Sequence, residues 1–137
     1  MTMINTVLSK LEDNSGEILG VTRIVAAFMF LQHGTQKMFS FPVEANSAFE
    51  LLSRGGIAGV IEVVGGLLLL IGLFTRPVAF LCSGLMCFAY WLAHAPRGFF
   101  LWTVGNGGDA AVLYCFLFLY IAAVGGGKFS VDAARGS

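Results

Sequence analysis

Four long apolar stretches constrain this chain of 137 residues more than any other feature. They lie at about 18–39, 56–75, 77–95 and 108–126, and a helix that crosses a bilayer needs about 20 mostly apolar residues. Charged residues make up 12% of the chain, about half of their usual share in soluble domains. We therefore expect an all-α membrane protein whose stretches form an antiparallel four-transmembrane-helix bundle, in a single domain over residues 1–137.

The segment before the first stretch has a different pattern. Its apolar residues recur at helical spacing, with polar residues elsewhere on the helix: Met3, Ile4, Val7, Leu8 and Leu11. This pattern predicts a short amphipathic helix that lies on the membrane surface. Because this more polar segment comes first, no signal peptide is predicted.

Prolines and the loops between stretches indicate how the helices connect. Pro77 follows the second stretch directly and is expected at a first helical position, so the second and third helices should form a hairpin. Pro96 should end the third helix at about Ala95, because proline disfavours helical backbone in the residue before it. The apolar residues within 40–55 suggest a short interfacial helix in that loop.

Lysines and arginines outside the stretches predict the orientation. Four fall on one side and two on the other: Lys10, Arg76, Lys128 and Arg135 against Arg54 and Arg97. Because cytoplasmic loops are enriched in these residues, both termini are expected in the cytoplasm, with the lipid bilayer as the surroundings. A net charge of zero gives no electrostatic footprint for nucleic acid.

Ionisable side chains gather toward the outer end of the predicted bundle. The first helix would bring His33 and Lys37 there, and the other three would bring Glu62, His94 and Asp109. Such groups cost about 2.5–3.5 kcal/mol each inside a membrane, so they are expected to be paired or to face a cavity. All four helices should therefore contribute to one shared polar interior.

Two interpretations of this interior remain open. It is either a ligand pocket near the extracytoplasmic face or a structural lock that fixes helix register, with Lys37, Arg23 or His33 as the partner of Glu62. In the pocket interpretation, the catalytic residues would be His33, Glu62 and His94. The ligand would be bound by Gln36, Lys37, Tyr90, Arg97 and Asp109. Several of them have structural alternatives, since Asp109 can complement a helix dipole and Lys37 can snorkel.

Metal and redox chemistry have weak signals. His33, Glu62, His94 and Asp109 are suitable ligand types, but no HxxxH or ExxH pair places two ligands on one helix, so no metal site is predicted. The three cysteines lie in apolar runs without a CxxC spacing and are expected to be reduced. No haem attachment motif is present.

Several segments together resemble the DoxX family of small membrane proteins. They are Leu31-Gln-His-Gly-Thr-Gln-Lys37, Gly59-Val-Ile-Glu-Val-Val-Gly-Gly-Leu67, Gly72-Leu-Phe-Thr-Arg-Pro77, Ala93-His-Ala-Pro-Arg-Gly98, Asn106-Gly-Gly-Asp109 and Gly125-Gly-Gly-Lys-Phe-Ser-Val-Asp132. The resemblance implies a four-helix protein of the bacterial inner membrane, related to subunits of quinol oxidation and thiosulfate:quinone oxidoreduction. Asp109 departs from the glutamate expected there, which shortens the reach of that acid.

These observations favour a quinone-linked redox membrane subunit. The resemblance implies a quinone as the bound group. The sequence has no flavin, haem or dithiol motif of its own, so a partner protein would supply the electron-transfer cofactor. A non-catalytic accessory subunit of a larger membrane complex is the alternative. A small transporter is a third hypothesis, and it would require oligomerisation because four helices are too few for a pore.

Overall fold

The structure is a computed structural model that describes residues 2–136, and all regular elements within that range are helices, as predicted. Their bounds are α1 Met3–Asp13, α2 Ser15–Phe39, α3 Arg54–Ile71, α4 Thr75–Ala89, α5 Thr103–Asn106, α6 Asp109–Val124 and α7 Val131–Ala134. A π-helical turn, η1 (Tyr90–His94), and a 3-10 turn, η2 (Ala95–Arg97), continue directly from α4.

Three helical segments are long and apolar enough to cross a membrane. They are Ser15–Phe39, Arg54–Ile71 and Thr75–Arg97, which correspond to the first three predicted stretches. The fourth stretch forms α6, which is apolar but has only 16 residues. Length and composition therefore confirm three of the four predicted membrane-length helices.

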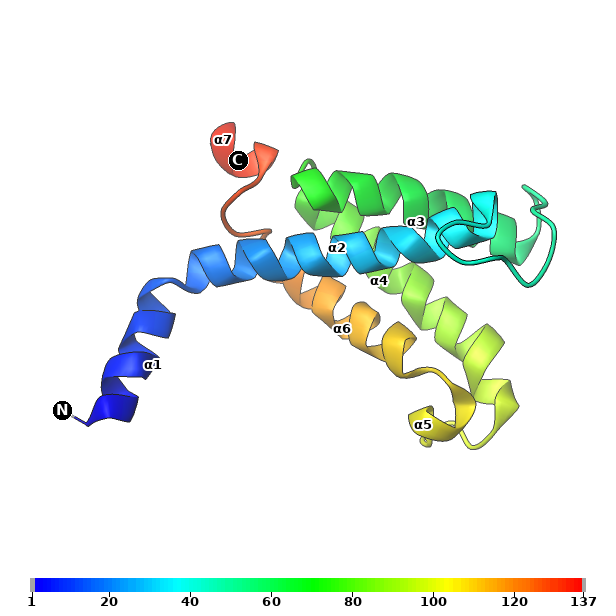
Figure 1. Ribbon diagram of the computed structural model, residues 1–137, viewed down its shortest axis with the longest axis horizontal. Coiled ribbons are helices and arrows are strands. Elements are labelled where there is room, and N and C mark those ends of the chain that lie inside the picture. Colours follow the sequence, from blue (N-terminus) through cyan, green and yellow to red (C-terminus); the bar gives the residue numbers. More distant parts are fainter. Residues whose placement is uncertain (1, 137) are drawn as a thin grey trace.

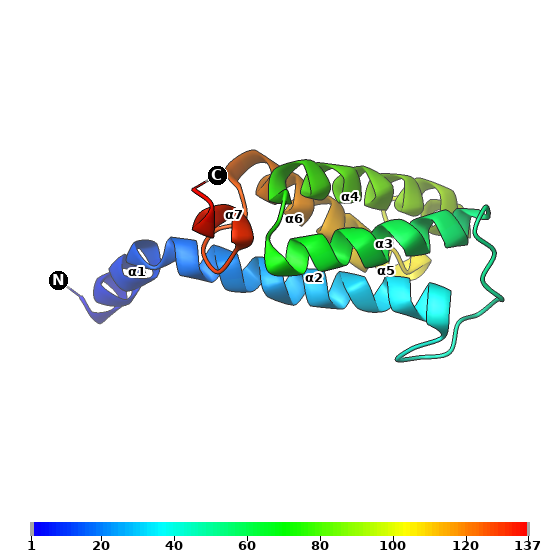
Figure 2. The same ribbon diagram turned by 90° about the horizontal axis from the view of Figure 1, so that it is seen from above.

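The helices are arranged as two pairs. Figure 1 shows α2 and α3 side by side and running in opposite directions, while α4 and α6 form a second pair at an angle to the first. The pairs are close together near α7 and diverge toward α5. Figure 2 shows α3 beside α2 from above, with α1 projecting beyond the start of α2. The ends of the two pairs that lie away from α7 are consequently separate regions of the molecule.

Glycines allow α2 and α3 to approach closely. A Cβ atom on Gly34 would lie 2.7 Å from the backbone nitrogen of Val63 and 2.8 Å from Cβ of Glu62. One on Gly66 would lie 3.0 Å from Cα of Leu31. Small residues at such contacts let helix backbones pack against each other in a membrane. This packing brings the end of α2 over Glu62.

A buried arginine joins the C-terminal segment to α2 and α3. Arg23 is completely buried, and its Nε donates to the carbonyl oxygen of Leu69 at 2.9 Å. Its other two nitrogens donate to the carbonyl oxygens of Gly126, Lys128 and Phe129. Leu69 lies about two turns along α3 from Glu62, so the prediction that Arg23 could be the partner of Glu62 is wrong.

The same C-terminal segment caps α4. The carboxylate of Asp132 accepts hydrogen bonds from the backbone N–H groups of Phe74 at 3.0 Å and Thr75 at 2.8 Å. Partial burial acts to raise the pKa of Asp132, but these hydrogen bonds outweigh it and hold the pKa below its usual value. The cap supplies acceptors for N–H groups that have none within the helix.

Three local predictions are wrong. α4 begins at Thr75 because Asp132 caps it there, so Pro77 is the third helical residue rather than the first. The loop 40–53 contains turns and no helix, since Pro42 and other turn-forming residues interrupt it. Helical backbone continues past Pro96 as the 3-10 turn η2, after the wider π-helical turn.

Candidate functional site

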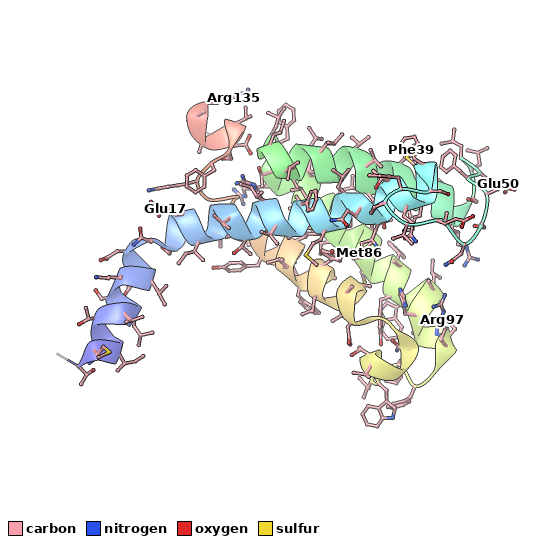
Figure 3. All side chains as sticks on the ribbon, viewed as in Figure 1. Glu17, Phe39, Glu50, Met86, Arg97 and Arg135 are labelled. Atoms are coloured by element: carbon pink, nitrogen blue, oxygen red, sulfur yellow. The ribbon has the colours of Figure 1, made fainter. Side chains whose placement is uncertain are left out.

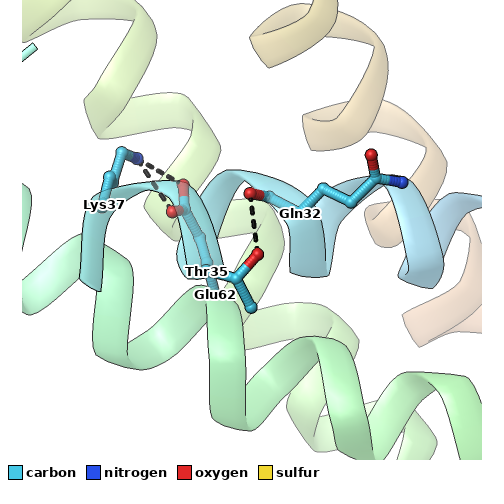
Figure 4. Close-up of polar contacts among 4 residues, drawn as sticks. All are labelled: Gln32, Thr35, Lys37 and Glu62. Carbon is cyan, nitrogen blue, oxygen red and sulfur yellow. Dashed lines mark hydrogen bonds and ion pairs between the residues drawn. The ribbon is translucent and has the colours of Figure 1, made fainter. Parts of the chain in front are cut away.

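An ion pair between α2 and α3 forms the centre of the site. Nζ of Lys37 lies 2.7 Å from Oε1 and 2.8 Å from Oε2 of Glu62 (Figure 4). The Glu62 side chain is 2% exposed, whereas that of Lys37 is 38% exposed. The expectation that Lys37 is a partner of Glu62 is confirmed, and the carboxylate has its charge matched at a depth where an unpaired one would be costly.

Lys37 also lines a hollow beneath the loop that joins α2 and α3. This hollow has a volume of about 210 Å³ and lies beneath residues 45–50, with Gln36, Ser53 and Gly56 in its wall. Lys37 is therefore the only member of the pair with substantial exposure to the surroundings. It connects a buried carboxylate to the loop that joins α2 and α3.

A second hollow lies on the α6 side of α2. It has a volume of about 260 Å³, and His33, Gln36 and Tyr114 contribute to its wall. The rings of His33 and Tyr114 meet edge to face, with centroids 6.0 Å apart at 83°. Gln36 lines both hollows and donates from Nε2 to the carbonyl oxygen of Glu44 at 3.2 Å. We call this second space the His33 hollow.

Tyr114 is a site residue that sequence reasoning missed. It is 7% exposed, and its hydroxyl has no hydrogen-bond partner among residues 2–136. Its ring stacks on that of Phe118, with centroids 5.6 Å apart. A buried polar group without a partner is uncommon, which makes this hydroxyl a candidate ligand contact; the Oγ1 atom of Thr75 is the other such atom among residues 2–136. Tyr120 on the same helix is exposed, so residue type alone could not identify Tyr114.

Two of the remaining predicted residues, Tyr90 and His94, lie in a separate polar cluster at the end of α4. Asn106 donates from Nδ2 to the hydroxyl of Tyr90 at 3.0 Å, and that hydroxyl donates to the carbonyl oxygen of Phe100. Nδ1 of His94 lies 3.4 Å from the carbonyl oxygen of Asn106. We call these residues the Tyr90 cluster, and they tie the π-helical turn to α5.

Arg97 and Asp109 are exposed and lie outside both polar groups. Figure 3 shows Arg97 at the end of the arm formed by α4, well apart from Phe39 and Glu50 at the end of the α2–α3 pair. Asp109 is the first residue of α6, where a negative charge complements the helix dipole.

The single shared interior expected from the sequence is thus two clusters. The structure brings together His33, Gln36, Lys37 and Glu62, and it places His94 and Tyr90 elsewhere because the two helix pairs diverge. Within the described part of the chain, no group of three or more His, Cys, Asp or Glu side chains could hold a metal ion. The catalytic and binding roles of these residues stay predictions.

Comparison with known proteins gives two matches. The sequence model of the DoxX family matches residues 18–95, more than half of the chain. A protein of Haemophilus influenzae described as uncharacterized is 40% identical over 128 residues, which cover 91% of this chain and 96% of the relative. No solved structure matches the chain.

Proposed function

The chain belongs to the DoxX family of small bacterial membrane proteins, and from this premise we propose that it is a quinone-linked redox subunit of the inner membrane.

All four apolar helices cross the bilayer, with both termini in the cytoplasm. α6 has 16 residues and measures about 24 Å at 1.5 Å per residue, a few ångströms less than a hydrocarbon core of about 30 Å. A bilayer accommodates such a deficit by thinning locally. α1 lies in the interface, because its apolar residues, Ile4, Val7 and Leu8 among them, are all exposed.

The quinone head occupies the His33 hollow. The observation that carries this assignment is Tyr114, which lines the hollow and whose buried hydroxyl has no partner among residues 2–136, so that it is a candidate donor for a carbonyl oxygen. The amide of Gln36 and the imidazole of His33 line the same hollow and provide further hydrogen-bonding groups. A quinone supplies two-electron chemistry coupled to two protons, and its two carbonyl oxygens suit this set of donors.

The protein's own ionisable groups then handle protons. His33 exchanges a proton at the head, since imidazole can give and take protons near neutral pH. Glu62 relays protons toward Lys37, with which its carboxylate is paired, and Lys37 lines the hollow beneath residues 45–50. Electrons pass to or from a partner protein that carries its own cofactor.

One observation favours the accessory-subunit alternative. The Lys37–Glu62 pair is fully matched in charge and joins two helices, which is what a structural lock requires. The Tyr114 hydroxyl supports the ligand site instead, because a lock between α2 and α3 has no use for a donor on α6 that lacks a partner among residues 2–136.

Binding of a quinone without an isoprenoid chain tests the proposal. The protein is placed in lipid nanodiscs and titrated with a short-chain benzoquinone by calorimetry. Tyr114→Phe removes one hydrogen bond of about 1–1.5 kcal/mol and should weaken binding about tenfold. Tyr120→Phe, on the exposed face of the same helix, is the matched control and should bind as wild type does. Equal binding by all three proteins, or none by any, refutes the site.

A further inference from the structure

We propose that the groove between α2 and α6 holds the single apolar chain of the ligand whose head occupies the His33 hollow. This inference rests on the proposed function and adds the part of the ligand that lies in the bilayer. The ligand class is therefore an amphiphile with a small polar head and a single apolar chain.

A third hollow, next to the His33 hollow, provides the space. It has a volume of about 440 Å³ and lies between α2 and α6, with Val21 and Val25 on one side and Leu113 and Leu117 on the other. Its lining is almost entirely apolar. A ligand segment with hydrogen-bonding groups would lose partners there, whereas a hydrocarbon or isoprenoid chain would not.

The two hollows adjoin each other. Met29 and Tyr114 line both of them, one from each helix. Along α2 the lining changes from Val21 and Val25, through Met29, to His33 and finally Gln36. These positions extend over about 22 Å at 1.5 Å per residue, with the apolar part toward the start of α2 and the polar part toward its end.

The sizes of the hollows set the kind of ligand. The His33 hollow, at about 260 Å³, is at or below the lower end of the range of roughly 300–1,000 Å³ found for drug-sized ligands, so the head is small. The apolar hollow is larger, at about 440 Å³, and its lining on α2 extends from Val21 to Met29. Because lipid is already apolar, the chain gains little affinity from the groove. The groove instead fixes the direction from which the head reaches Tyr114.

Photolabelling locates the chain directly. A benzoquinone with a decyl chain that carries a diazirine at its midpoint is irradiated with the full-length protein in nanodiscs, and the labelled peptides are identified by mass spectrometry. Labelling should concentrate at residues 21–29 and 113–117 and should fall at least fivefold when excess short-chain benzoquinone occupies the head site. Leu113→Trp should lower this labelling at least threefold while leaving the affinity for the short-chain quinone within twofold of wild type. Leu67→Trp, on a lipid-exposed position of α3, is the matched control.

The outcomes separate this inference from the function on which it rests. If the short-chain quinone binds but the label spreads evenly or falls on α3 and α4, the chain position is wrong and the head site stands. Labelling of the groove that the short-chain quinone does not displace assigns it to membrane lipid and also overturns the inference. Absence of short-chain quinone binding removes both proposals.

Discussion

The unequal exposure of Lys37 and Glu62 predicts unequal costs when their ion pair is broken. Lys37→Met leaves a carboxylate that is 2% exposed without its cation, and such a loss costs about 3–5 kcal/mol. Glu62→Gln leaves an ammonium that is 38% exposed and borders a hollow, so hydration can replace the lost partner. Its cost should be that of one charge-assisted hydrogen bond, about 1.5–3 kcal/mol.

The double variant provides the sharper expectation. Lys37→Met combined with Glu62→Gln removes the stranded charge, so it should be more stable than Lys37→Met alone by about 1–2 kcal/mol. The free energy of unfolding is measured by titration with sodium dodecyl sulfate in mixed micelles, followed by far-ultraviolet circular dichroism. Lys10→Met, on the exposed helix α1, is the control and should change stability by less than about 0.5 kcal/mol. Equal costs for the single variants, or additive costs in the double variant, would refute the reasoning.

Two further predictions concern the supporting structure. Gly34→Ala would place a Cβ atom 2.7–2.9 Å from three atoms of α3 and should destabilise the protein by about 1–3 kcal/mol. Gly84→Ala is the control, because its Cβ atom would meet nothing within 4 Å and should not destabilise the protein. The same detergent titration compares the two variants, and equal stability would contradict the close α2–α3 packing. Because hydrogen bonds hold the pKa of Asp132 below its usual value, its contribution to stability is present above about pH 4 and lost as the pH falls through the lowered pKa. Asp132→Asn should flatten this acid-limb loss of stability, and an unchanged pH profile would contradict the cap.

Much of the fold could be predicted because hydrophobic length is a strong signal. The segment that became α2 and the hairpin of α3 and α4 were expected within a few residues of their observed bounds. The C-terminal segment could not be predicted, because its contacts with Arg23 depend on carbonyl oxygens that every residue has. The loop 40–53 could not be predicted either, because its turn-forming residues prevent the helix that its apolar residues suggest.

The candidate site was predictable only in part. The pairing of Lys37 with Glu62 followed from the high cost of a lone charge in a membrane, which leaves few arrangements. The separation of His94 from His33 did not follow, because periodicity reports the face of a helix and the depth of a residue but not the angle between helix pairs. The π-helical turn at Tyr90 further changes which face its neighbours share.

The central claim is that the ligand head binds at the His33 hollow and not at the Tyr90 cluster. The most direct measurement is the dissociation constant of the short-chain benzoquinone for His33→Ala and His94→Ala, determined in the same nanodiscs as for Tyr114→Phe. We predict at least a tenfold increase for His33→Ala and a change within twofold for His94→Ala, whose nearest polar contact is the carbonyl oxygen of Asn106. A larger loss for His94→Ala, or equal losses for both histidines, would contradict the account.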